Sequence, residues 1–261
     1  VYNKIIKQIM NKLPILDEWH SKELLKKFDG ISWNESIKEL HEPQNQGNYK
    51  NNFYQRLAFD EIFSTFLVNS EIRKKIKKIK KKKKKIDFKK QNLIIKNLDF
   101  TLTKDQLKSL QEINNDLCSN TKMFRLLQGD VGSGKTIVSL IAAYNTINSG
   151  FQVALMAPTE ILARQHFNLA KKLLPKNVKI RLISGKSEYK DKKEILNELS
   201  NHEIDIVFGT HAIFQKKVTF KKLGLIIIDE QHKFGVNQRK KLSDKGGKDC
   251  DVLLMTATPI P

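Results

Sequence analysis

The stretch that decides the fold lies at residues 129–136 and reads Gly129-Asp130-Val131-Gly132-Ser133-Gly134-Lys135-Thr136. It matches the pattern G-x-x-x-x-G-K-[ST] at every fixed position, and the backbone amides of this pattern cradle nucleotide phosphates. Residues 123–127 are typical of a short buried strand, and residues 136–149 carry apolar side chains at helical spacing. Strand, glycine loop and helix are the context that the pattern needs, because the loop amides and the positive end of the helix both attract an anion.

The side chains of this loop have separate expected tasks. Lys135 would place a positive charge on the β- and γ-phosphates, and the Thr136 hydroxyl would bind Mg²⁺. The glycines would let consecutive N–H groups face the phosphates. The residues predicted to bind the nucleotide here are Gly129, Gly132, Ser133, Gly134, Lys135 and Thr136.

The composition is strongly basic. The 261 residues carry a net charge of +20, and thirteen basic but only two acidic residues lie within 71–90. The run Lys80–Lys85 has two readings, a solvated tether or helix whose lysines face water, and a contact with a phosphate backbone. We favour the solvated tether, because like charges repel one another and need no partner.

Other compositional features exclude several classes of protein. No apolar run approaches the ~18 residues of a membrane span, and no signal peptide opens the chain. The two cysteines and six histidines show no metal-binding spacing, which favours a reducing cytoplasm.

The sequence suggests three segments. Residues 1–45 are expected to be the helical tail of an upstream domain, with a capping-box spacing between Ser32 and Glu35. Residues 46–98 are expected to form a long basic linker helix, whose isoleucine stripe continues under the lysines. Residues 99–261 would form the nucleotide domain. Because the chain begins at Val1 without a Met and ends at Pro261 directly after a motif, we expect it to be a piece of a longer protein.

The nucleotide domain alternates strands and helices. Apolar strands are predicted at 153–156, 179–183, 204–208, 223–228 and 252–255, with helices at 161–174 and 189–199. Such alternation predicts an α/β fold, a parallel sheet covered by helices on both faces. The polar motifs follow the carboxyl ends of the strands, where such sheets bind ligands.

Two further groups are expected near the nucleotide. Thr103 can cap a helix that begins beside it, which places the Gln106 amide where it could read the edge of adenine. Asp229 follows an apolar strand and would hold Mg²⁺, provided that this strand neighbours the phosphate loop. Glu230 would orient and deprotonate the attacking water.

Other strand ends are suited to different tasks. Thr256 and Thr258 offer hydroxyls on a tight turn that could relay the state of the phosphates. A separate set of loops offers hydroxyls, helix-start amides and an arginine, which suit the phosphates of a nucleic acid without reading its bases. The residues predicted to touch nucleic acid are Pro158, Thr159, Arg164, Thr210 and His211.

The succession of these motifs resembles that of superfamily 2 helicases, and more narrowly the RecG family of bacterial ATP-dependent branched-DNA helicases. The segments that carry the resemblance are LQGD at 127–130, APTEILA at 157–163, GTHAIFQ at 209–215 and DEQHKFGV at 229–236. The resemblance implies a RecA-like P-loop domain that uses ATP and Mg²⁺ and moves on branched or forked double-stranded DNA. It also implies coupling roles for Gln231 and His232, a monomer, and a place in DNA repair and recombination in the bacterial cytoplasm, at the nucleoid.

Some features depart from that family. Lys233 stands where the family usually has arginine, and the lysine run is more extreme than is usual there. The second RecA-like domain with its arginine finger, and the upstream wedge domain, do not occur in this sequence, so we expect half of an ATPase site. The alternatives are a transcription-repair coupling translocase, which has a similar acidic box, and a nucleotide-binding module that is not catalytic by itself.

Overall fold

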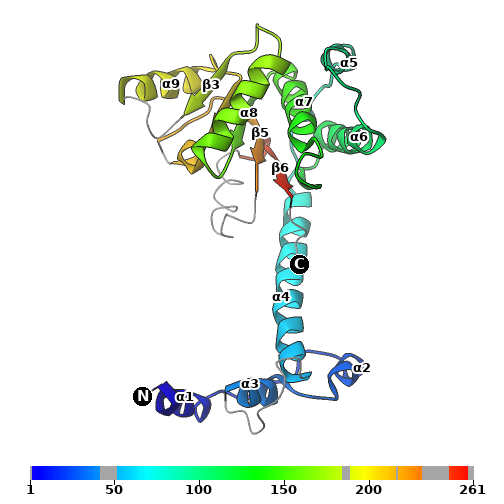
Figure 1. Ribbon diagram of the computed structural model, residues 1–261, viewed down its shortest axis with the longest axis vertical. Coiled ribbons are helices and arrows are strands. Elements are labelled where there is room, and N and C mark those ends of the chain that lie inside the picture. The colour runs from blue at the N-terminus through cyan, green and yellow to red at the C-terminus, as the bar shows by residue number, and fades with distance from the viewer. Residues whose placement is uncertain (1, 42–51, 184–188, 216, 231–246, 258–261) are drawn as a thin grey trace. The chain divides into compact units, whose positions relative to one another are not determined.

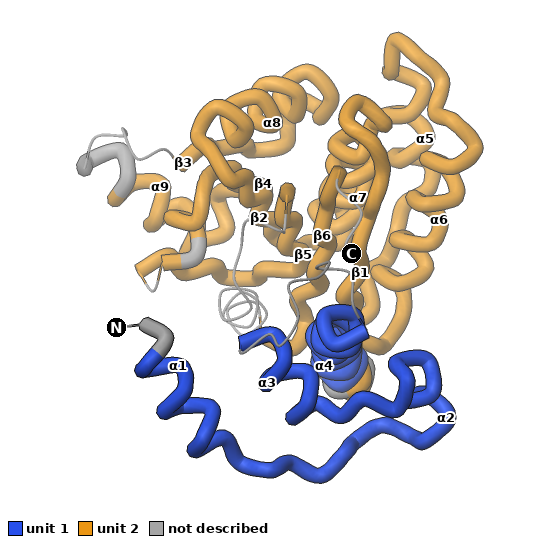
Figure 2. Tube along the Cα trace, turned by 60° about the horizontal axis from the view of Figure 1, so that its bottom comes forward, with its two compact units in different colours: residues 1–72, 261 blue, residues 73–260 orange. Residues whose placement is uncertain are grey.

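The structure is a computed structural model that describes residues 2–41, 52–183, 189–215, 217–230 and 247–257 (Figure 1). The chain divides into two compact units, residues 1–72 and residues 73–260 (Figure 2). The first unit holds short helices and most of helix α4 (Asn52–Lys77). The second unit holds the β-sheet.

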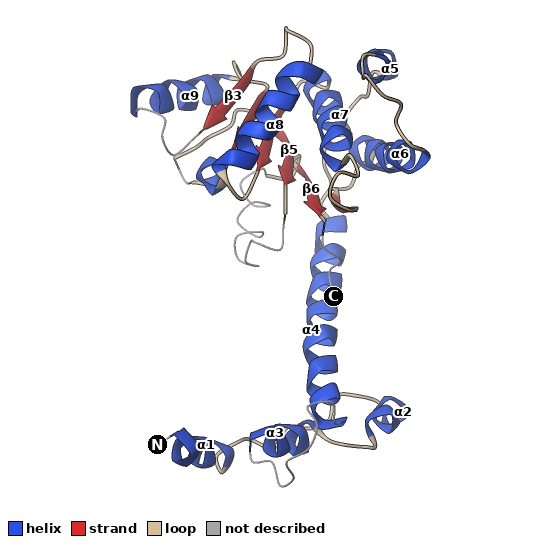
Figure 3. Cartoon of the chain, viewed as in Figure 1, coloured by secondary structure: helices blue, strands red, loops and turns tan. Residues whose placement is uncertain are grey.

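A parallel sheet of six strands forms the centre of the second unit (Figure 3). The order across the sheet is β1-β6-β5-β2-β4-β3, and every neighbouring pair is parallel. The strands are β1 (Phe124–Gln128), β2 (Gln152–Met156), β3 (Ile180–Ile183), β4 (Ile206–Gly209), β5 (Leu223–Ile228) and β6 (Asp251–Thr256). Most of them fall on apolar runs of the sequence, because a strand covered on both faces has little surface left for water. Arg125 and Arg181 interrupt the runs in β1 and β3.

Helices cover both faces of this sheet. Val153 and Leu155 of β2 belong to an apolar cluster that includes side chains of α6, α7 and α8, whereas Ala154 and Met156 belong to a second cluster that includes Leu199 of α9. The predicted α/β fold with both faces covered is therefore confirmed. The helices of this unit are α5 (Phe88–Lys96), α6 (Lys104–Cys118), α7 (Lys135–Asn148), α8 (Glu160–Leu173), α9 (Tyr189–Asn201) and the short 3₁₀ helix η2 (His211–Phe214).

Helix α7 is the most enclosed of these, and residues 137–146 are all buried. Its Asn145 amide nitrogen donates to the Gln91 side chain of α5 at 2.7 Å and to the Asn114 side chain of α6 at 2.9 Å. Asn114 in turn donates to Gln91 at 2.8 Å. Such a buried polar network fixes one arrangement of its members. The helix that starts at the phosphate loop is therefore held in register by two neighbours.

The first unit is built from α1 (Tyr2–Met10), α2 (Lys22–Leu25), the 3₁₀ helix η1 (Lys26–Phe28), α3 (Trp33–His41) and α4. The predicted capping box at the start of α3 is confirmed, because Ser32 N donates to Glu35 Oε2 at 2.8 Å and Glu35 N to Ser32 Oγ at 3.2 Å. The loop before α2 is bonded to α4 through Asp60, which accepts from His20 Nε2 at 2.6 Å.

The predicted linker helix does not continue through the lysines. Helix α4 ends at Lys77, and the segment 79–85, here called the lysine strap, is extended. Lys80 pairs with Thr121 in an isolated antiparallel bridge, and Lys84 N donates to Leu117 O at 3.1 Å. The backbone of the strap is therefore bonded to the connection between α6 and β1.

Two lysines of the strap are buried, contrary to the expectation that all of them face water. The Nζ atoms of Lys81 and Lys84 both lie 2.6 Å from Asp251 Oδ2, and all three side chains are fully enclosed. Asp251 Oδ1 accepts from Met123 N at 2.7 Å. Burial lowers the pKa of Lys81, and the adjacent Asp251 carboxylate opposes that shift. The remaining lysines of the strap, Lys80, Lys82, Lys83 and Lys85, are exposed.

Candidate nucleotide and nucleic-acid site

The phosphate loop leaves the carboxyl end of β1 and runs into α7. Gly132 and Gly134 both have φ +81°, a left-handed backbone that glycine adopts without strain. A side chain at Gly134 would also collide with the Gln106 amide, since a Cβ there would lie 2.4 Å from Gln106 Nε2. These two positions therefore favour glycine, and the sequence pattern fixes it at 134.

Lys135 lies across its own loop. Its ammonium nitrogen donates to Gly129 O at 2.5 Å and to Asp130 O at 2.8 Å. These bonds hold the ammonium group at the rim of the loop. Because phosphate oxygens are charged, they are stronger acceptors than the two carbonyls and would replace them. Thr136, the next residue, is half-buried in the first turn of α7.

Gln106 rests on the phosphate loop. Thr103 caps α6 as predicted, in a capping box in which Thr103 N donates to Gln106 Oε1 at 2.9 Å and Gln106 N to Thr103 Oγ1 at 3.2 Å. The other end of the amide, Nε2, donates to Ser133 O at 2.9 Å. Each amide atom still has capacity for one more hydrogen bond. The reading of adenine by Gln106 stays a prediction.

The acidic pair follows β5. Asp229 is 8% exposed, and its backbone N donates to Met156 O at 2.8 Å. Its carboxylate Oδ2 lies 2.7 Å from His166 Nε2 of α8. Glu230 has φ +50°, a left-handed backbone that costs about 1–2 kcal/mol for a residue with a side chain. Such backbone strain clusters at functional sites.

The strand that precedes Asp229 is not the direct neighbour of β1, so the condition attached to the prediction for Asp229 is not met as stated. β6 lies between them, and it pairs Gln128 with Thr256 on one side and Ile228 with Leu254 on the other. Thr256 is fully buried, and its carbonyl accepts from Gly129 N at 3.3 Å. The phosphate loop, Thr256 and Asp229 therefore lie at the carboxyl ends of three adjacent strands, β1, β6 and β5. Gln231, His232 and Thr258 lie outside the described residues.

The residues predicted to touch nucleic acid follow β2 and β4, which are neighbours. Thr159 caps α8 by accepting from Leu162 N at 3.3 Å, and Pro158 is half-buried beside it. The two loops are joined by a bond from Ala157 N to Gly209 O at 2.9 Å. The side chains of Arg164 and His211 are exposed, and Thr210 is half-buried.

His166 was not predicted, and neither was the Asp251 ion cluster. A single histidine on an amphipathic helix gives no local pattern, and its partner Asp229 is 63 residues away in the chain. Cys250, beside the ion cluster, is inert, because burial raises the pKa of its thiol to about 12.

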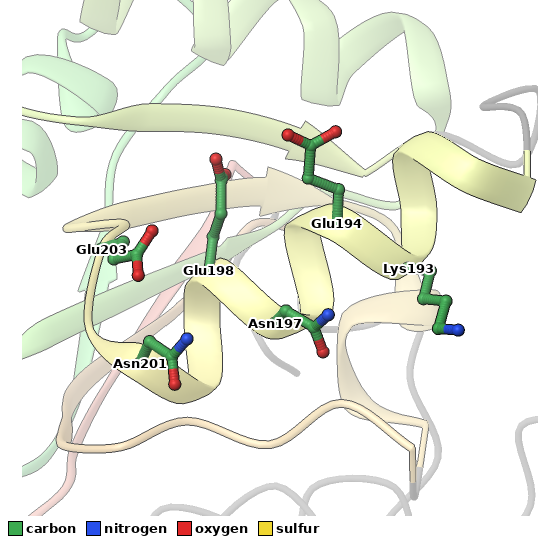
Figure 4. Close-up of a pocket in the computed structure, with 6 residues that line it drawn as sticks. All are labelled: Lys193, Glu194, Asn197, Glu198, Asn201 and Glu203. Carbon is green, nitrogen blue, oxygen red and sulfur yellow. The ribbon is translucent and has the colours of Figure 1, made fainter.

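A separate hollow of about 430 Å³ lies along α9 (Figure 4). Asn201 and Glu203 precede the start of β4, so the hollow extends to the amino end of that strand, whereas the phosphate loop lies at the carboxyl end of β1. It is open and polar, with three acidic side chains among its six lining residues. One of these, Glu198, already pairs with Arg181 at 3.0 Å. The residues around it are Lys193, Glu194, Asn197, Glu198, Asn201 and Glu203.

Two kinds of feature are absent from the described residues. They contain no group of three or more His, Cys, Asp and Glu side chains placed to hold a metal ion. Within the same part of the chain, no helix has the length and apolarity that a membrane crossing requires.

Comparison with known proteins agrees with this arrangement of strand-end loops. The family model described as "DEAD/DEAH box helicase" matches residues 103–261. The chain belongs to the DEAD/DEAH box helicase family. The matched region starts at the capping residue Thr103 and includes the phosphate loop and the acidic pair.

Several members of this helicase family are similar along most of the chain. The ATP-dependent DNA helicase RecG of Streptococcus pneumoniae serotype 4 is 41% identical over 95% of the chain, and the chain covers 36% of that relative. RecG of Thermotoga maritima is 48% identical over 79% of the chain and is covered to 26%. The chain therefore spans about a third of the length of these relatives, and the expected resemblance to RecG is confirmed.

Solved structures agree on the fold. A structure of RecG bound to a three-way DNA junction matches 99% of the chain with 38% identity and a TM-score of 0.71, and 35% of that protein is covered. The helicase UvsW of bacteriophage T4 matches 68% of the chain at 16% identity with a TM-score of 0.50, and 62% of it is covered. The latter likeness concerns the fold alone.

Proposed function

We propose that residues 99–261 form the first RecA-like half of the ATPase site of a RecG-type ATP-dependent DNA helicase, which remodels stalled forks and branched DNA. One observation carries the proposal: the phosphate loop, Thr256 and Asp229 lie at the carboxyl ends of three adjacent parallel strands, β1, β6 and β5. Ligands of open parallel sheets bind at this edge. The similarity to RecG proteins supports the choice of DNA helicase among nucleotide-using enzymes.

The side chains at this edge suit ATP with Mg²⁺. The Thr136 hydroxyl and the Asp229 carboxylate are oxygen ligands of the kind that Mg²⁺ prefers, and these two residues would hold it. When bound, Mg²⁺ would neutralise charge on the phosphate oxygens. Lys135 would exchange the carbonyls of Gly129 and Asp130 for oxygens of the β- and γ-phosphates. Glu230 would orient the attacking water and accept its proton.

The loops after β2 and β4 would hold DNA. Thr159 and Thr210 offer hydroxyls, and Arg164 and His211 offer exposed polar groups, which suits phosphates rather than base edges. Pro158 would shape the first of these loops. Gln231, His232, Thr256 and Thr258 would couple the two sites. Within this proposal the protein acts as a monomer at the bacterial nucleoid, in DNA repair and recombination.

The proposal is tested by comparing the full-length protein with residues 1–261 in an ATPase assay, with and without forked duplex DNA. The full-length protein should hydrolyse ATP in a DNA-stimulated manner. Residues 1–261 should bind nucleotide weakly and turn over very little, since an arginine finger is worth about 10³–10⁵ in rate in comparable enzymes. Robust DNA-stimulated turnover by residues 1–261 alone, or none by the full-length protein, would refute the assignment.

A further inference from the structure

The contacts of Asp229 identify a residue that the site does not otherwise use. We propose that His166 is a positioning residue, which holds the Asp229 carboxylate for Mg²⁺ and thereby joins helix α8 to the nucleotide site. This inference rests on the proposed function, because it takes Asp229 as a metal ligand.

The bond between the two side chains is short and enclosed. His166 Nε2 lies 2.7 Å from Asp229 Oδ2, and the side chains are 9% and 12% exposed. A carboxylate oxygen only accepts, so the hydrogen of this bond lies on Nε2. A buried carboxylate needs such a donor, because burial of an unpaired charge is costly. The bond therefore fixes the orientation of the Asp229 side chain.

The backbone of Asp229 is tied to the same part of the fold. Asp229 N donates to Met156 O at 2.8 Å, and Met156 is the last residue of β2. Helix α8 begins at Glu160, a few residues further on, and it carries His166. Asp229 is thus bonded to β2 through its backbone and to α8 through its side chain.

Helix α8 and the loop before it also carry part of the surface proposed to touch DNA. Thr159 caps α8, and the exposed Arg164 lies two residues before His166. From the first residue of α8 to His166 the helix rises only about 9 Å. A shift of α8 on contact with a phosphate backbone would therefore move the His166 ring, and with it the Asp229 carboxylate.

The expected effect follows from known metal sites. Removal of an outer partner of a metal ligand typically lowers metal affinity or activity about 10–100-fold. Loss of the His166 donor should accordingly raise the Mg²⁺ concentration needed for nucleotide binding. A role in packing alone would instead lower the melting temperature and leave the Mg²⁺ requirement unchanged.

The test uses the full-length protein and a matched pair of substitutions. His166→Gln keeps an N–H donor, and His166→Met has nearly the same volume without one. Asn168→Ala, at an exposed position of the same helix, is the control. Binding of a fluorescent ATP analogue is measured while Mg²⁺ is titrated, with and without forked duplex DNA. Thermal unfolding is recorded for each variant.

His166→Met should raise the half-saturating Mg²⁺ concentration about tenfold, His166→Gln should stay within about threefold of wild type, and Asn168→Ala should not change it. The change that DNA produces in this Mg²⁺ requirement should shrink in the Met variant only. Equal Mg²⁺ requirements in the Met variant and wild type would overturn the inference. If His166→Met does not fold, the test uses His166→Gln. A roughly tenfold rise in the half-saturating Mg²⁺ concentration of a folded His166→Gln variant would overturn the inference.

Asp229→Asn separates the inference from the proposed function. If Asp229→Asn leaves the Mg²⁺ requirement unchanged, the proposed metal role of Asp229 fails and the inference fails with it. If Asp229→Asn raises the requirement and His166→Met does not, only the role of His166 is rejected. A rise in both variants, with recovery in His166→Gln, supports both.

Discussion

Replacement of Asp251 by Asn is expected to destabilise the second unit far more than replacement of either lysine that it binds. Lys81 and Lys84 share one carboxylate oxygen at 2.6 Å each, and all three side chains are fully enclosed. The cluster therefore carries two positive charges and one negative charge. Removal of a lysine leaves a balanced pair, whereas removal of the carboxylate leaves two buried cations close together.

The magnitudes follow from this imbalance. Loss of one partner from a buried ion pair lowers the free energy of unfolding by about 3–5 kcal/mol, and Asp251→Asn should reach at least this range because two cations lose their partner. Lys84→Met keeps most of the apolar stem and leaves Lys81 paired, so about 1 kcal/mol is expected. The Asn side chain can still accept from Met123 N, so the difference reports the charge.

The assay is urea unfolding of the 261-residue chain, followed by circular dichroism. Tryptophan fluorescence would report the wrong unit, because Trp19 and Trp33 both lie within residues 1–72. Lys82→Met and Lys83→Met are matched controls in exposed positions and should change the free energy of unfolding by less than about 0.5 kcal/mol. The reasoning is refuted if Asp251→Asn loses no more stability than Lys84→Met, or if the controls lose as much.

Three further outcomes are expected in the full-length protein. Lys135→Ala should lower DNA-stimulated ATPase activity about 10²–10³-fold, because it removes a charge aimed at the transferring phosphate; near-normal turnover would reject the assignment. Glu230→Gln should bind ATP but stall hydrolysis, and weaker binding with unchanged turnover per bound ATP would make Glu230 a structural residue. Replacement of the four exposed strap lysines by Gln should change the slope of log affinity for duplex DNA against log salt by about one unit or less, whereas a loss of roughly four units would show that they are primary DNA contacts. These four are Lys80, Lys82, Lys83 and Lys85.

The sheet and its covering helices were predictable because their causes are local. Most strands are apolar runs bounded by polar residues, as in β5, where all six residues are buried. Two helix starts were equally readable, since Ser32 and Thr103 each cap a helix through their own side chains. The requirement for glycine at 134 was contained in the loop pattern itself, whereas the positive φ of Gly132 falls at a position that the pattern leaves open.

The parts that were missed depend on residues far apart in the chain. The spacing of Ile72, Ile76 and Ile79 favoured one helix that continues under the lysines. Ile72 and Ile76 do lie in α4, but this helix ends at Lys77. Two lysines of the strap, Lys81 and Lys84, are instead bound by Asp251, which is 167 residues beyond Lys84. The position of β6 between β1 and β5 had no local cause either, because the last strand of the described chain inserts between two strands that come earlier in the sequence. Local periodicity contains no information about either partner.

Strand β6 connects the lysine strap with the phosphate loop. Its first residue, Asp251, binds Lys81 and Lys84 of the strap, and its last residue, Thr256, accepts from Gly129 N of the phosphate loop. β1 is tied in the same way, since Met123 precedes it and donates to Asp251 while Gln128 ends it. A solvated tether would need none of these bonds. The strap is therefore part of the second unit and is bonded at the amino ends of β1 and β6. The carboxyl ends of the same two strands lie beside the phosphate loop. The exposed lysines of the strap thus project from a segment that is fixed to the sheet.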